Sequence, residues 1–175
     1  KRVTMYPLPN RIIHWLTLAL VIAAFASIEL RELFEKGTEN RELFKFVHFQ
    51  IGAGLFLLTL IRLVNKKLNP EPAMVNMDKF KMFAAKSVHI LLLGCLIVMP
   101  ILGVSILIAE AKDVTILGFD LPNLMQEDKD TAHLLEEIHE TLGSVFMILI
   151  FVHAAAAIWH HKIVKDDTLK KMLGR

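Results

Sequence analysis

Four long apolar segments dominate the sequence and limit the chain to few folds. They run over about 12–30, 46–64, 87–109 and 138–159, each near the roughly 20 residues that a helix needs to cross a bilayer. The chain of 175 residues is 54% hydrophobic with a mean hydropathy of +0.49, which leaves too little polar surface for a soluble domain. We therefore expect one membrane domain over residues 1–175, an all-α bundle of four transmembrane helices.

Smaller features refine this expectation. Pro100 lies inside the third segment and should kink that helix, and Gly52 in the second segment allows a flat ligand to approach. The residues over 69–72 are typical of a loop, and those over 162–173 predict a short amphipathic helix on the membrane surface. The basic start of the first segment is similar to a secretory signal, but its long apolar run favours a span.

Lysine and arginine are unevenly distributed between the two ends of the expected bundle. Fourteen lie at the end that carries the termini: Lys1, Arg2, Arg11, Arg62, Lys66, Lys67, Lys79, Lys81, Lys86, Lys162, Lys165, Lys170, Lys171 and Arg175. Six lie at the other end: Arg31, Lys36, Arg41, Lys45, Lys112 and Lys129. The positive-inside rule therefore predicts cytoplasmic termini. The outer end also has 14 acidic residues, so its average field should repel an anion.

Five of the eight histidines lie in or at the start of apolar segments: His14, His48, His89, His139 and His153. His139 and His153 are 14 residues apart, which is about four helical turns and a rise of roughly 21 Å, so both point the same way. Depth places His48 with His139 at the outer level, and His14, His89 and His153 at the inner level. Imidazoles inside a membrane need partners, so we expect two stacked redox or metal centres.

Facing imidazoles suit a haem iron, provided that the porphyrin has an apolar slot with small neighbours. Small residues follow the candidate ligands: Gly52, Gly143 and Ala154 to Ala157. Cationic side chains near the membrane faces suit haem propionates: Arg11, Lys45 and Arg62. The single Cys95 excludes a Cys-x-x-Cys-His motif for covalent haem. Zinc is the alternative, but a structural zinc site gathers four ligands close together. The remaining histidines are expected at the interface or surface: His133, His160 and His161.

The chain resembles the bacterial cytochrome b561 family of small dihaem membrane proteins over nearly its whole length. The first residues that carry the resemblance are Arg11-Ile12-Ile13-His14-Trp15-Leu16 and Ile28-Glu29-Leu30-Arg31. The most specific part is His139-Glu140-Thr141-Leu142, then His153-Ala154-Ala155-Ala156-Ala157, His160-His161 and Lys165-Asp166-Asp167-Thr168-Leu169. The resemblance implies a multi-pass protein of the bacterial inner membrane with two non-covalent haem b groups. It implies that His14 and His153 hold the inner haem, and that His48 and His139 hold the outer one.

The family also implies electron exchange with ubiquinone, and some members look like superoxide oxidases. We therefore expect an oxidoreductase that moves electrons between a periplasmic donor, with superoxide as the candidate, and ubiquinone. His89 is left over at the inner level and suits proton exchange with a reduced quinone. The other candidates for the quinone site are Arg11, Lys86 and His160. Arg62 and Gly52 are candidates for haem binding.

Two other classes of protein remain open from the sequence. The first is a membrane anchor that relays electrons for a hydrogenase or dehydrogenase. Its short loops leave little surface for docking such a partner, and the sequence does not require a partner protein. A haem-free transporter or structural bundle is the third class, which a visible spectrum would separate from the first two. The expected partners are membrane lipid and ubiquinone, with superoxide as the candidate donor, and no nucleic acid is expected.

Overall fold

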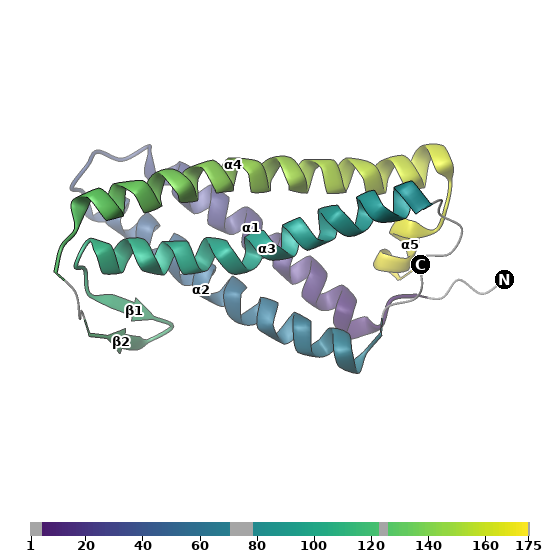
Figure 1. The fold of residues 1–175 in the computed structure, drawn as a ribbon, viewed down its shortest axis with the longest axis horizontal. Helices are drawn as coiled ribbons and strands as arrows, with labels where there is room; N and C mark the ends of the chain where they lie inside the picture. The colour runs from purple at the N-terminus through teal and green to yellow at the C-terminus, as the bar shows by residue number, and fades with distance from the viewer. Residues whose placement is uncertain (1–4, 71–78, 123–125, 175) are drawn as a thin grey trace.

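The structure is a computed structural model that describes residues 5–70, 79–122 and 126–174. Four helices in the described residues are long and apolar enough to cross a membrane, which confirms the four-helix expectation. They are α1 (Leu8–Arg31), α2 (Glu39–Leu68), α3 (Lys79–Ala109) and α4 (Lys129–Trp159). They run lengthwise through the molecule, as Figure 1 shows. Lys1, Arg2, Arg175 and the second half of the expected loop over 69–72 lie outside the described residues.

The helices pack as two pairs, with α1 chiefly against α2 and α3 chiefly against α4, while α2 and α3 join the pairs. One buried cluster receives side chains from all four helices: Val21, Ala24, Leu55, Cys95, Leu96 and Phe146. This cluster lies near the middle of each helix, so apolar packing holds the pairs together at mid-depth. The ends of the bundle are left for polar side chains.

The helices extend beyond the apolar segments at their polar ends. The helix α3 begins at Lys79, eight residues before the expected span, so Lys79, Lys81 and Lys86 are helical rather than in a loop. The helix α4 begins after Asp128, whose carboxylate accepts hydrogen bonds from the backbone N–H and the hydroxyl of Thr131. These bonds satisfy an otherwise unpaired donor of the first turn, which is why the helix begins there.

A small β-hairpin between α3 and α4 was not predicted. It consists of β1 (Val114–Ile116) and β2 (Phe119–Leu121), which pair antiparallel with Ile116 opposite Phe119. Its two-residue loop has φ of +50° at Leu117 and +87° at Gly118, as a tight hairpin requires. The hairpin, the α1–α2 loop and the start of α4 lie at one end of the bundle, which we call the hairpin end (Figure 1).

The opposite end carries the start of α1 and the last described residues, and we call it the terminal end (Figure 1). The segment over 162–173 is not one helix as expected. A π-helical turn, η1 (His160–Val164), continues α4, and Lys165 then adopts a left-handed φ of +58° before α5 (Thr168–Leu173). Because the left-handed residue reverses the chain, α5 folds back toward the start of α1. The backbone N–H of Tyr6 and the indole N–H of Trp15 donate to carbonyls of Lys171 and Met172.

Candidate functional site

His48 from α2 and His139 from α4 meet near the hairpin end, and we call them the hairpin-end pair. Their ring centroids are 6.2 Å apart with the planes at 74°. The Nδ1–H of His48 donates to the backbone carbonyl of Ala24 at 2.8 Å. Because the acceptor is a carbonyl, the proton must lie on Nδ1, which leaves Nε2 with a free lone pair. The structure therefore brings these two residues together and orients one of them.

A cavity of about 1330 Å³ surrounds the hairpin-end pair. It exceeds the roughly 300–1,000 Å³ of pockets for drug-sized molecules. Gly52 lines it, and a Cβ added at Gly52 would meet no atom within 4 Å, so space adjoins α2 at this residue. Gly103 of α3 also lines it, with His139 Cε1 at 3.8 Å from an added Cβ. Because they have no side chains, the two glycines leave the cavity wide beside the histidines.

His14, His89 and His153 lie together near the terminal end. The rings of His14 and His153 have centroids 6.2 Å apart at 61°, and those of His89 and His153 are 5.1 Å apart at 66°. The inner-level histidines of the sequence thus form one cluster, in which His153 lies near both others. Because His153 and His139 share the continuous helix α4, the two groups are separated by about 21 Å along its axis.

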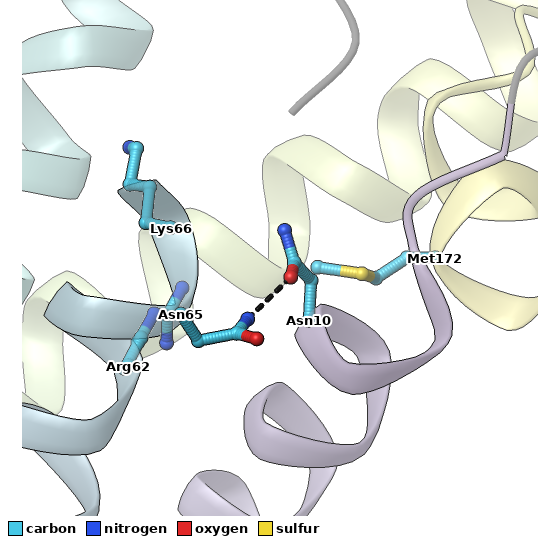
Figure 2. A pocket seen from close by; sticks show the side chains of 5 residues that line it. All are labelled: Asn10, Arg62, Asn65, Lys66 and Met172. Carbon is cyan, nitrogen blue, oxygen red and sulfur yellow. Dashed lines mark hydrogen bonds between the residues drawn. The ribbon is translucent and has the colours of Figure 1, made fainter. Parts of the chain in front are cut away.

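A polar pocket of about 10 Å³ lies beside this cluster at the terminal end, and Figure 2 shows its lining. The amide of Asn65 donates to the side-chain oxygen of Asn10, whose own amide donates to the carbonyl of Asn69 at 3.1 Å. Arg62 and Lys66 line the pocket one helical turn apart on α2. The volume suits about one water molecule. The network joins the start of α1 to the end of α2, the segment that also carries Arg62.

The other candidates at the terminal end have different surroundings. The guanidinium of Arg11 lies against Gly174, and its Nε is buried without a hydrogen-bond partner. His160 is hydrogen-bonded through Nδ1 to the carboxylate of Asp166. Burial raises the pKa of Asp166, but hydrogen bonds from Thr168 and His160 outweigh it and hold the pKa below its usual value. Lys86 is exposed and lies three residues before His89, on the same face of α3.

Three basic side chains at the hairpin end, those of Arg31, Arg41 and Lys45, are paired with carboxylates. Arg41 is buried; its Nη1 donates to the carbonyls of Arg31 and Phe34 at 3.2 and 2.9 Å. Its Nη2 donates to both carboxylate oxygens of Glu32, which also accepts from Arg31. Lys45 is paired with Glu42 at 2.8 Å. Hydrogen bonds from Arg31 and Arg41 lower the pKa of Glu32, which keeps this carboxylate charged.

Both 6.2 Å separations fit bis-imidazole ligation of one metal ion. A metal–imidazole bond is about 2.0–2.1 Å, and the ring centre lies about 1.1 Å beyond the bonded nitrogen. Two imidazoles that would hold one metal ion from opposite sides would thus have ring centres about 6.3 Å apart. The 5.1 Å between His89 and His153 is too short for the same arrangement. The described residues contain no group of three or more His, Cys, Asp or Glu side chains that suits a bare metal ion, so a zinc site of that kind is not formed among them.

The model of the family described as prokaryotic cytochrome b561 matches residues 5–175. The chain belongs to this family. It is similar to cytochrome b561 homolog 1 of Escherichia coli K12, with 33% identity over 93% of each chain. It is also similar to a probable superoxide oxidase, CybB, of Yersinia pestis, with 32% identity over 92% of this chain and 91% of that one. Cytochrome b561 homolog 2 of Escherichia coli K12 is 29% identical over 93% of this chain and 87% of that one.

This cytochrome b561 family member is therefore a multi-pass protein of the bacterial inner membrane that takes part in electron transfer. Proteins of the family bind haem b. The donor set fits that group, because neutral imidazoles are common haem ligands. His48, Gly52 and His139 line one large cavity, and His14 and His153 repeat the 6.2 Å spacing at the other end.

Sequence reasoning missed three residues with distinctive surroundings. Gln50 of α2 bonds the hairpin through its side-chain amide. Leu117 has a left-handed φ and lines the large cavity. His161, which we expected at the interface, has a buried Nδ1 without a hydrogen-bond partner in the described residues. The sequence does carry a signal for the hairpin, because Leu117-Gly118 separates two short alternating segments.

Proposed function

We propose that this cytochrome b561 holds two haem b groups and transfers electrons across the inner membrane to ubiquinone, with superoxide as the periplasmic donor. The observation that carries the proposal is the repeated 6.2 Å spacing of two histidine pairs at opposite ends of one continuous helix. The positive-inside rule assigns the terminal end to the cytoplasm and the hairpin end to the periplasm. Bound haems would supply one-electron carriers at these two depths.

The hairpin-end pair is the proposed ligand set of the outer haem. The carbonyl of Ala24 holds the Nδ1 proton of His48, so the ring presents Nε2 as the ligand atom in a fixed orientation. His139 faces it across the cavity from α4. Gly52 leaves room beside the ring, because any larger side chain there would project into the slot. The chain's own contribution is thus to orient one imidazole and keep the slot open and apolar.

The terminal-end pair, His14 and His153, is the proposed ligand set of the inner haem. Arg62 lines the adjacent polar pocket and is the proposed cationic partner of a propionate (Figure 2). His89 is too close to His153 for an iron to fit between them. An imidazole can both accept and donate a proton near neutral pH, so His89, next to a proposed ligand, suits proton exchange with a quinone.

The quinone site is proposed around His89, on the exposed face of α3 that also carries Lys86. A site on this face would be reached from the lipid, where ubiquinone is dissolved. Arg11 and His160 remain candidates at the same end of the bundle, but they already contact the tail, through Gly174 and Asp166 respectively. His89 is therefore the first residue to test.

Superoxide as the donor is supported by the relative named as a probable superoxide oxidase. The charges of the hairpin end do not favour an anion, because Arg31 and Arg41 share Glu32, and Lys45 is paired with Glu42. Steering by a free basic patch of these residues is therefore not part of the proposal. Stopped-flow mixing of the oxidised protein with superoxide tests the donor directly, and haem that stays oxidised excludes it.

Haem content tests the ligand sets. We expect that His48→Ala and His139→Ala each lower the pyridine haemochrome from two haems per chain to one, and that His14→Ala and His153→Ala do the same. His133→Ala is the matched control, since the side chain of His133 is 78% exposed. Two haems retained in either variant of a pair would contradict that pair.

A separate measurement tests His89. We expect His89→Ala to retain two haems and to reduce ubiquinone more slowly, because the proton donor is lost but both ligand pairs are kept. Loss of a haem in His89→Ala would instead make His89 a ligand. Unchanged quinone reduction with both haems present would exclude the proton-transfer role.

A further inference from the structure

The β-hairpin lies over the cavity of the hairpin-end pair. Ile116, Leu117 and Phe119 line the same cavity as His48 and His139. The pairing of Ile116 with Phe119 places these two apolar side chains on one face, because directly opposite residues in a ladder share a face. The other face is polar, since the hydroxyl of Thr115 donates to the carboxylate of Asp120 at 2.7 Å. The hairpin therefore presents its apolar face to the cavity.

Gln50 binds the hairpin to α2 through both ends of its amide. Its Nε2–H donates to the carbonyl of Thr115 at 2.6 Å, and its Oε1 accepts from the backbone N–H of Leu117 at 2.8 Å. These backbone groups are two residues apart, so the amide reproduces the bonding of a neighbouring strand at an open edge. Gln50 is also two residues after His48, so the element that presents a proposed ligand also holds the hairpin.

Leu117 has a backbone conformation that its residue type disfavours. Its φ is +50°, in the left-handed region that favours glycine or asparagine. A hairpin loop of two residues normally has Asn-Gly or Gly-Gly, and here the second residue is Gly118. Strain of this kind persists where the surroundings require the side chain. Leu117 lines the cavity with an apolar side chain, which neither glycine nor asparagine would supply.

We propose that the hairpin is a lid over the periplasmic end of the cavity, that Leu117 is its apolar plug, and that Gln50 is the positioning residue that holds it closed. The proposal rests on the proposed haem at His48 and His139. The lid keeps bulk water away from that site while leaving the ligands in place. Gln50 acts through the hairpin and touches neither ligand in this scheme, so it is not a catalytic residue.

Water exclusion has a measurable effect on a redox centre. An oxidised haem carries more positive charge than a reduced one, and a dry, apolar surrounding disfavours the charged form. Solvent access and the surrounding dielectric therefore set the reduction potential. Opening the lid should lower the midpoint potential of the haem at the hairpin end and leave that of the other haem unchanged. A purely structural hairpin would not have this selective effect.

Two variants open the lid by different routes. Gln50→Met keeps a side chain of similar length but removes both hydrogen bonds. Leu117→Gly removes the plug but relaxes the left-handed residue, so it should stabilise the turn rather than damage it. Thr115→Ala is the matched control, because it removes a hydrogen bond of the hairpin on its polar face and leaves the backbone carbonyl that Gln50 uses. All three are measured in the full-length protein with haem bound.

Redox titration followed in the visible spectrum is the first measurement. We expect one midpoint to shift to lower potential in Gln50→Met and in Leu117→Gly, with the second midpoint unchanged, and no shift in Thr115→Ala. Two unchanged midpoints in Gln50→Met would overturn the lid, and a shift in that variant alone would overturn the plug. A wild-type protein with fewer than two haems would instead overturn the proposed function, so the two failures are distinguishable.

Hydrogen–deuterium exchange of residues 112–121 is the second measurement, and it does not depend on haem retention. We expect the amide of Leu117 to exchange about fivefold faster or more in Gln50→Met, because its acceptor is lost. Thr115→Ala should leave that amide protected. Unchanged exchange in Gln50→Met would overturn the role of Gln50 even if the variant lost its haem.

Discussion

Arg41 should determine the stability of the hairpin end, and Arg41→Met tests this. The residue is only 7% exposed, although it carries a charge. Its guanidinium donates to two backbone carbonyls, of Arg31 and Phe34, at the end of α1 and in the loop that follows. The last carbonyls at the C-terminal end of a helix have no partner within the helix, and a cationic donor there also interacts favourably with the helix dipole. Methionine keeps the volume of the stem but satisfies neither carbonyl.

The magnitude follows from these bonds. A hydrogen bond that involves a charged group contributes about 1.5–3 kcal/mol, and Arg41 makes two to carbonyls. In the variant, water can reach the loop and bond these carbonyls in part. We therefore expect Arg41→Met to lower the free energy of unfolding by about 3 kcal/mol. The pairing with Glu32 adds little, because that carboxylate is exposed and screened by solvent. A loss of this size changes the unfolding equilibrium constant about 100-fold.

Arg31→Met is the matched control, since it removes the same charge next to the same carboxylate. Arg31 donates to the carboxylate of Glu32 through Nε and Nη2. Within the described residues its side chain donates to no backbone carbonyl, unlike that of Arg41. Reversible unfolding in mixed detergent and denaturant micelles, followed by circular dichroism, measures both variants. We expect a loss at least three times larger for Arg41→Met. Equal losses would refute the assignment of the stability to the two carbonyl bonds.

Three further outcomes are expected. Gly52→Leu should lose one haem and Gly54→Leu none. Of these two glycines only Gly52 lines the cavity, although an added Cβ would meet no atom within 4 Å at either. Haemochrome content measures this, and equal haem loss in both variants would contradict a haem site beside Gly52. The difference in stability between wild type and Glu32→Gln should be constant above about pH 5 and vanish as pH falls through the lowered pKa of Glu32. A carboxyl with a lowered pKa stabilises the fold only while it is charged. Thermal melts at several pH values measure this difference, and a difference that grows in acid would contradict the prediction. Asp166→Asn should weaken the bond to His160 and speed tryptic cleavage in α5; unchanged cleavage would show that the tail is held elsewhere.

Much of the candidate site was predictable from residue spacing. Fourteen residues are close to four whole helical turns, so His139 and His153 lie on one face of their helix whatever their neighbours. The length of the apolar segments placed His48 and His14 at matching depths. Spacing along one helix cannot reveal which residue of another helix faces it, so the inner level remained a group of three. The ring separations of 6.2 Å for His14 and 5.1 Å for His89 are the basis on which we propose His14 as the partner of His153.

Other features could not be predicted because they depend on contacts between distant segments. The sequence places Arg31, Arg41 and Lys45 at the outer end, but only the way in which α1 and α2 meet brings Arg41 against Glu32. The same applies to His160, which the fold of the tail places against Asp166. Charges counted along the chain give the sign of a field, and only their spatial pairing shows which of them remain available.

The sequence by itself determined the membrane class, the number of spans and the histidines to consider as haem ligands, because hydropathy and helical periodicity are local properties of the chain. The tertiary structure alone decided the pairing of imidazoles, the cavity beside Gly52 and the hairpin over it. The physical reason is that these depend on how closely two helix pairs approach and on single hydrogen bonds such as that of Gln50 to Thr115. A distance across the bundle is a property of packing, and no segment of the sequence encodes it alone.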